Sequence, residues 1–177
     1  MKLNKSLLIA LLVGVFAATT LRWAVSDDKK TTDDAATKRT RKTVRMLDDI
    51  YKGSIVTITQ HYVDDENTIP AGTAFKQLFK AVEEKGWHKV RLVDATGEPY
   101  NDENVAKSNF EKAAIKKLVA GEKWVEAETK SKDGKRVLQV ATPIPVVFAK
   151  CIMCHDNYDG VPKGKAIGAL TYEVPIE

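Results

Sequence analysis

The sequence predicts an α+β domain, with an antiparallel sheet and N-terminal helices packed on one side of it. Three observations favour this class. Two amphipathic helical patterns come first, segments of alternating apolar and polar residues follow, and a four-residue turn joins two of those segments. Helices and strands that are grouped along a chain, rather than alternating regularly, are typical of α+β proteins. The length of 177 residues suits one domain with an additional segment.

Two helices are predicted in the first half of the chain. Residues 44–62 carry apolar side chains at spacings of three and four, which is the period of one helix face. These side chains are Val44, Leu47, Tyr51, Ile55, Ile58 and Tyr62. A second helix is predicted over residues 74–85, with Thr73 as its N-cap and Gly86 as its end.

A strand and a third helix follow. Residues 87–95 alternate as a strand, which places His88 and Arg91 on opposite sides of it. Ser108 is the expected N-cap of a helix over residues 109–120.

A hairpin is predicted next, with strands at residues 124–129 and 136–142 joined by a turn at 131–134. Pro143 and Pro145 break the alternating pattern, so the second strand is expected to end before them.

A final strand is predicted over residues 166–174. A small antiparallel sheet with a helical wrap and one open pocket is the arrangement called PAS-like.

The first 26 residues are typical of an export segment. Two lysines precede an apolar run at residues 6–21, and small residues suited to a signal peptidase stand just before Asp27. The run is shorter than the roughly 20 residues that cross a bilayer comfortably. Arg22 and Trp23 are nevertheless typical of a membrane interface, so both a cleaved signal peptide and an uncleaved anchor stay open.

Composition and charge divide the rest of the chain. Residues 27–43 are polar and basic and are interpreted as a tether, which leaves residues 44–177 as the folded domain. The formal net charge is +4, and most of that excess lies in residues 1–26, so the domain is nearly neutral. A nearly neutral domain argues against a nucleic-acid partner. The expected membrane contact is through the N-terminal segment alone, and the expected location is the periplasm.

The chemistry of the chain is indicated by Cys151-Ile152-Met153-Cys154-His155, the CxxCH motif of c-type haem attachment. Two thiols at this spacing reach the two vinyl groups of one haem, and the adjacent imidazole binds the iron. The motif uses both cysteines of the chain. The prediction is one covalent haem c bound by Cys151, Cys154 and His155, with His155 as the proximal iron ligand.

Two other interpretations of the motif agree less well with the sequence. A thioredoxin-like dithiol would be followed by a helix, which lowers the thiol pKa, but the residues after His155 are typical of a loop. A zinc site needs further ligands, and the remaining histidines, His61 and His88, are distant in sequence.

Four segments of the chain together resemble the haem-c-binding PAS-like domain family, first described as a domain of unknown function. They are GWHKVRLVDATGEPYN, FEKAA, ATPIPVVFAKCIMCH and IGALTYEVPIE. Members are stand-alone exported proteins or the extracytoplasmic sensor part of histidine kinases. The resemblance covers residues 44–177 and implies a PAS-like fold, one covalent haem and a redox or small-ligand sensing role. It also implies an upstream cysteine as sixth iron ligand in some members, and the matching stretch here is Ile69-Pro70-Ala71.

The sixth ligand is therefore sought among other residues. His61 near the end of the first helix is a possible distal ligand, His88 and Met46 are alternatives, and an open iron is the fourth possibility. Met153 lies inside the motif and is not expected to reach the opposite haem face. Lys150, Lys163 and Lys165 are candidates to offset the charge of the haem propionates.

Three functions follow from these expectations. A redox or small-gas sensor, with NO or CO as ligand, needs an open or easily displaced sixth position. An electron-transfer cytochrome with a redox partner protein needs two strong axial ligands instead. A peroxidase-like enzyme needs a distal acid–base pair, and the opposite orientations of His88 and Arg91 argue against that reading.

Overall fold

The computed structural model describes residues 33–65, 69–147, 149–153 and 155–177. The predicted export segment therefore lies outside the described residues. None of the helices within these ranges is long and apolar enough to cross a membrane.

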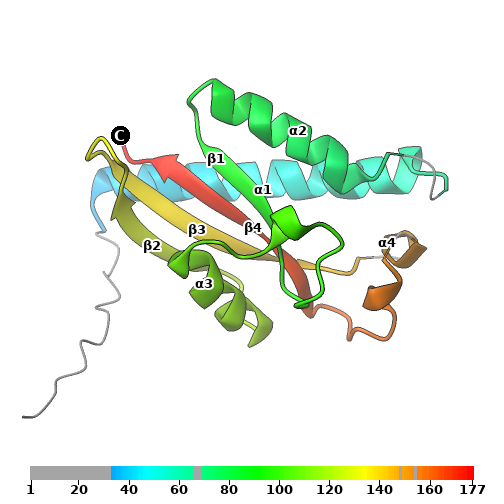
Figure 1. Ribbon diagram of the computed structural model, residues 1–177. Helices are drawn as coiled ribbons and strands as arrows, with labels where there is room; N and C mark the ends of the chain where they lie inside the picture. The colour runs from blue at the N-terminus through cyan, green and yellow to red at the C-terminus, as the bar shows by residue number, and fades with distance from the viewer. Residues whose placement is uncertain (1–32, 66–68, 148, 154) are drawn as a thin grey trace, which may run out of the picture.

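The fold is a four-stranded antiparallel sheet with helices on both faces, and its strand order is β1-β4-β3-β2 (Figure 1). Its strands are β1 (Lys89–Asp94), β2 (Val125–Lys130), β3 (Arg136–Pro145) and β4 (Ala166–Pro175). The predicted α+β class with an antiparallel sheet is confirmed. Because β4 pairs with both β1 and β3, the last strand of the chain lies inside the sheet.

The long helix α1 (Ala35–Tyr62) and the helix α2 (Ala71–Glu84) share one face of the sheet. The predicted apolar stripe of α1 packs here: Val44 and Tyr51 are buried against Leu170 and Tyr172 of β4, and Phe79 of α2 joins them. Tyr62, the last residue of that stripe, is exposed instead.

The opposite face is covered by α3 (Asn109–Val119), through Ala114 and Leu118. As predicted, Ser108 caps this helix, and it forms a complete capping box with Glu111. The N-terminal helices thus lie on one side as expected, and the third helix adds a second layer.

The first helix begins earlier than the sequence predicted, so residues 35–43 belong to it and not to a tether. Asp34 caps the helix by accepting a hydrogen bond from the backbone N–H of Thr37 (2.8 Å). The basic run here also binds the sheet, because the guanidinium of Arg41 pairs with Glu126 of β2 (2.8 Å).

Helix α2 also begins earlier, with Pro70 in place of Thr73 as its N-cap residue. The fixed backbone of proline suits a helix start, and the Pro70 carbonyl accepts hydrogen bonds from the N–H groups of Thr73 and Ala74. Gly86 follows the helix with a positive φ, as expected.

Strand β3 continues through Pro143 and Pro145, where the sequence predicted its end. The pairing of β2 with β3 reaches only as far as Ala141, so one edge of β3 is unpaired beyond that point. A proline, which lacks an N–H, is tolerated at such an edge. The far end of β3 thereby extends toward α4 (Lys150–Met153), which lies at one end of the sheet (Figure 1).

Candidate functional site

A cavity of about 240 Å³ opens at the end of the sheet that carries α4. Its walls come from the C-terminal half of α1, the start of α2, the connection before α3, and the ends of β1, β3 and β4. On α1 the lining residues follow one stripe of the helix: Lys52, Ile55, Val56, Thr59 and, just beyond the helix, Val63. Most of the remaining wall is apolar, including Leu92, Ile144, Pro145, Val147 and Ile167.

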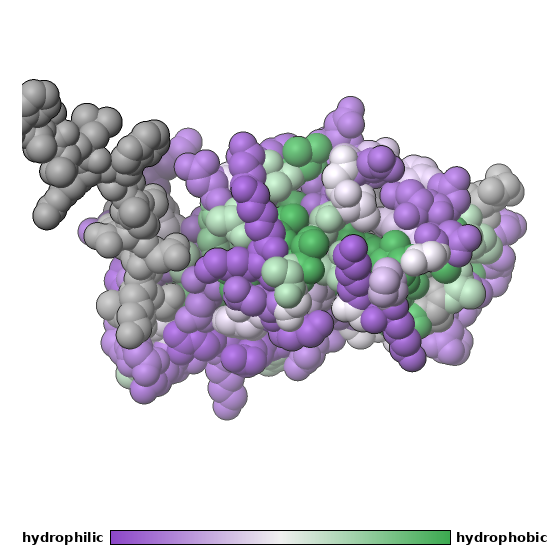
Figure 2. Space-filling model, turned by 90° about the horizontal axis from the view of Figure 1, so that it is seen from below, coloured by the Kyte–Doolittle hydropathy of each residue, from purple (hydrophilic) through white to green (hydrophobic). Residues whose placement is uncertain are grey.

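The outer surface contrasts with this cavity. Figure 2 shows hydrophilic side chains over most of the lower face of the molecule, with apolar side chains surfacing in patches between them.

His155 lines the cavity, in the segment directly after α4. Its imidazole lies between two aromatic rings. The ring of Tyr158 stacks on it at 4.6 Å with an interplanar angle of 16°, and the ring of Tyr100 meets it edge-on at 5.0 Å and 88°. The Nδ1 atom of His155 is buried without a hydrogen-bond partner in the described part of the chain. Buried polar atoms are normally paired, so Nδ1 is an exception, and a histidine that lines a cavity can bind a metal through its other ring nitrogen, Nε2.

Electrostatics favour the neutral imidazole, which is the form that binds a metal. Burial lowers the pKa of His155, and the nearby carboxylate of Asp156 opposes this shift. Burial also raises the pKa of Tyr158 to about 12, so this phenol is uncharged at neutral pH.

Cys151 lies in α4, is half-buried and lines the same cavity, so the structure brings it together with His155. Cys154 lies outside the described residues. The α4 segment is attached to α1 through Lys150, whose ammonium donates hydrogen bonds to the carbonyls of Gln60 (3.0 Å) and Val63 (2.7 Å). These carbonyls belong to the end of α1, where a cation also complements the helix dipole.

None of the three side chains nominated as sixth ligand lines the cavity. His61 is exposed, because it lies about 160° around α1 from both Thr59 and Val63, which do line it. Met46 is 54% exposed. His88 is buried in the core, where its Nε2 shares a hydrogen bond with the hydroxyl of Tyr51 (2.9 Å). The structure therefore gives no support to His61 as distal ligand.

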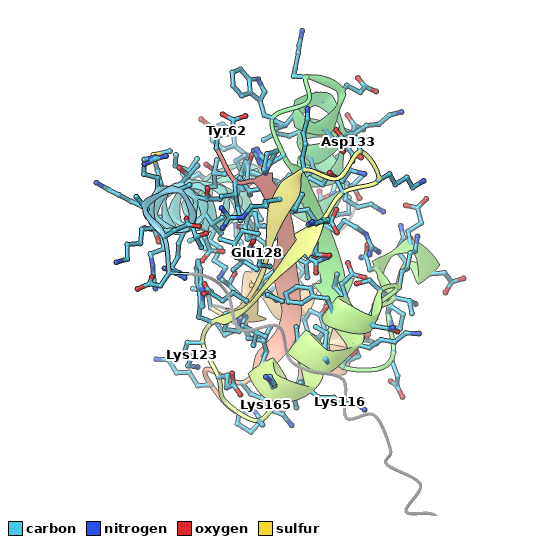
Figure 3. All side chains as sticks on the ribbon, turned by 90° about the vertical axis from the view of Figure 1, so that its left-hand side faces the viewer. Tyr62, Lys116, Lys123, Glu128, Asp133 and Lys165 are labelled. Carbon is cyan, nitrogen blue, oxygen red and sulfur yellow. The ribbon has the colours of Figure 1, made fainter. Side chains whose placement is uncertain are left out.

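Two further expectations concern charged residues. Arg91 and His88 do lie on opposite faces of β1: the guanidinium of Arg91 pairs with Glu111 of α3 (2.5 Å), whereas His88 contacts Tyr51 of α1. Of the three lysines proposed to face the haem propionates, Lys150 lines the cavity, whereas Lys163 and Lys165 are exposed and do not line it. Figure 3 shows Lys165 at the edge of the molecule.

One polar cluster of the site was not predicted. Lys52 extends along the cavity wall and its ammonium binds the carboxylate of Asp48 (3.0 Å) and the hydroxyl of Thr142 (2.9 Å). The same carboxylate accepts hydrogen bonds from Thr142 (2.5 Å) and from Tyr172 (2.9 Å). The spacing of Asp48 and Lys52 along α1 is the one sequence signal for this cluster, because residues four apart share a helix face.

The residues present fit a haem bound through the CxxCH motif. A neutral imidazole and one thiol from the same short segment line an apolar cavity, and these are two of the three donors that c-type attachment uses. The third would be Cys154, which lies outside the described residues. No cluster of three His, Cys, Asp or Glu side chains, as a protein metal site needs, occurs in the ranges that the structure describes.

Comparison with known proteins identifies the fold and the family. A solved structure described as the crystal structure of the cyanobacterial heme-protein Tll0287 has the same fold, with a TM-score of 0.52 at 14% identity. The match covers 81% of this chain and 97% of that one. No curated protein sequence matches the chain. The family model named Tll0287-like matches residues 29–173, so the chain belongs to the Tll0287-like family.

Proposed function

We propose that the protein is an exported, mono-haem c-type domain that senses redox state or a small gas such as NO or CO. The observation that carries this proposal is that His155 and Cys151 line the same apolar cavity, whereas His61, His88 and Met46 do not. With one imidazole at the cavity and none of these side chains on its walls, the iron of a bound haem would be accessible to a small ligand.

The haem, when bound, supplies an iron that takes a small ligand or changes its oxidation state. The residues of this chain do the rest. Cys151 and Cys154 would hold the group covalently, His155 would offer a neutral nitrogen, and the apolar walls would pack against the haem.

A sensor also needs a path from the haem to the outside of the domain. The hydrogen bonds of Lys150 join the haem-binding segment to the end of α1. That helix begins at Ala35, close to the predicted export segment. A shift of α4 would therefore move α1, the helix that follows the predicted export segment.

The proposal is tested by absorption spectra of the protein produced with cytochrome c maturation in an exporting host. We expect a haem spectrum that shifts when CO is added to the reduced protein. A low-spin spectrum that CO leaves unchanged would instead identify a six-coordinate electron-transfer cytochrome, and a protein without haem would refute both. His155→Ala is expected to change the spectrum, and the matched variant His61→Ala is expected to leave it unchanged.

Export is a separate part of the proposal. Fractionation of the producing cells should place the protein in the periplasm or on the outer face of the inner membrane. N-terminal sequencing then distinguishes a chain that begins at Asp27 from one that retains its apolar segment. Protein confined to the cytoplasm would contradict the proposed location.

A further inference from the structure

The imidazole of His155 is enclosed by tyrosine rings in two nearly perpendicular directions. Tyr158 lies parallel to the imidazole, at 16° and 4.6 Å, and Tyr100 stands against it at 88° and 5.0 Å. A stacked ring resists tilting of the imidazole, whereas an edge-on ring resists sliding within its plane. Together the two contacts restrict the motions that would carry the nitrogen away from a bound iron.

The two tyrosines come from distant parts of the chain. Tyr158 follows His155 closely, in a short 3-10 helix (Asp156–Tyr158). Tyr100 belongs to the connection between β1 and α3, and its hydroxyl donates a hydrogen bond to the carboxylate of Asp156. The side-chain amide of Asn157 also donates to the carbonyl of Glu98 (3.4 Å). These bonds fasten the connection onto the segment that carries His155.

Ring contacts are needed here because the usual orienting bond is missing. A histidine that binds a metal normally donates its other ring N–H to a carboxylate or a carbonyl, and this bond fixes the ring orientation. In the described part of this chain the Nδ1 atom of His155 has no such partner, although it is buried. Asp156 is adjacent in sequence, yet its carboxylate accepts the hydroxyl of Tyr100.

We propose that Tyr158 and Tyr100 are positioning residues that set the orientation of the His155 imidazole toward the haem iron. This inference rests on the proposed haem function. The aromatic ring of Tyr158, rather than its hydroxyl, holds the His155 imidazole in its orientation. Phenylalanine therefore replaces Tyr158 without loss, whereas an aliphatic side chain does not.

The test compares Tyr158→Leu and Tyr158→Phe with wild-type holoprotein by electron paramagnetic resonance of the oxidised haem. Wild type and Tyr158→Phe are expected to give the same single signal. Tyr158→Leu is expected to lose that signal in favour of a broadened or multiple one, at unchanged haem content. Tyr62→Leu is the matched control, because Tyr62 is 72% exposed and does not line the cavity of His155. An unaltered signal in Tyr158→Leu would overturn the proposal.

A second readout keeps the inference separate from the proposed function. In the full chain produced without haem, NMR reports the ring protons of His155, which the stacked ring of Tyr158 shifts upfield. That shift is expected in wild type and in Tyr158→Phe and is expected to vanish in Tyr158→Leu. Its absence from wild type would refute the ring contact even if haem binds. A wild type that takes up no haem would refute the proposed function alone. If Tyr158→Leu does not fold, Tyr100→Leu is measured in the same two ways.

Discussion

Replacement of Asp48 by alanine is expected to destabilise the domain by about 2–4 kcal/mol. The carboxylate of Asp48 accepts hydrogen bonds from Thr142 (2.5 Å) and Tyr172 (2.9 Å), and it binds the ammonium of Lys52 (3.0 Å). Thr142 and Tyr172 are 2% and 1% exposed, so water does not replace the lost partner. Burial, and then the negative charge of Asp48, raise the pKa of Tyr172, so the phenol is a donor that needs an acceptor.

The magnitude follows from the two buried hydroxyl groups. A buried donor left without a partner costs about 1–3 kcal/mol. Lys52 donates to the Thr142 oxygen and cannot accept its O–H, so Asp48→Ala leaves the hydroxyl donors of both Thr142 and Tyr172 without their acceptor. The ion pair with Lys52 is partly exposed and adds less than about 1 kcal/mol. Asp48→Asn retains an acceptor oxygen and is expected to cost only about 1 kcal/mol.

Urea unfolding followed by circular dichroism measures the effect. With an m value of about 2 kcal/mol/M, a loss of about 3 kcal/mol lowers the midpoint by about 1.5 M. Asp49→Ala is the control, because this neighbouring carboxylate is exposed and should change stability by less than about 0.5 kcal/mol. If Asp48→Ala were no more destabilising than Asp49→Ala, the reasoning about buried hydroxyl groups would be wrong.

Three further predictions concern other parts of the fold. Lys150→Met removes both hydrogen bonds to the end of α1, so we expect the free energy of unfolding to fall by about 1–2 kcal/mol and amide hydrogen exchange in α4 to become faster. Unchanged exchange would contradict the coupling of α4 to α1. Burial alone would raise the pKa of Glu111, but hydrogen bonds from two backbone N–H groups and the charge of Arg91 outweigh burial and lower that pKa. The ionised Glu111 therefore stabilises the fold fully above its unfolded pKa of about 4.3, and this stabilisation is lost as pH falls through the folded pKa. Unfolding measured between pH 6 and roughly pH 3 should therefore show a weaker pH dependence in Glu111→Gln than in wild type, and an equal dependence would refute the assignment. Ser108→Ala removes the N-cap of α3 and should cost about 1 kcal/mol in urea unfolding, whereas a neutral result would contradict the capping box.

Local signals predicted much of the fold. Ser108 predicts the start of α3, the turn at residues 131–134 predicts the hairpin, and the alternation at residues 87–95 predicts a strand with His88 and Arg91 on opposite sides. For α3 and the hairpin, the deciding interactions are formed between residues close in the chain.

The errors arise where partners are far apart in sequence. Residues 35–43 look like a polar tether because nothing local shows that Arg41 pairs with Glu126, 85 positions later. The extension of β3 through Pro143 depends on how far the neighbouring strand pairs, which the alternating pattern alone does not indicate.

The candidate site, like the fold, could be predicted from the sequence only in part. The CxxCH motif predicts Cys151 and His155 together, and the structure places both at one cavity. The sequence left the sixth ligand undecided, because the face of α1 that lines the cavity depends on how this long helix is rotated against the sheet. That rotation presents Lys52 to the cavity and His61 to solvent.

The central claim is that this cavity holds one covalently attached haem. The most direct measurement is the intact mass of the denatured protein after production with cytochrome c maturation. We expect the mass of the polypeptide plus one haem, and we expect Cys151→Ala and Cys154→Ala each to remove one of the two attachments. A mass equal to that of the polypeptide alone, with no haem retained after denaturation, would contradict the account.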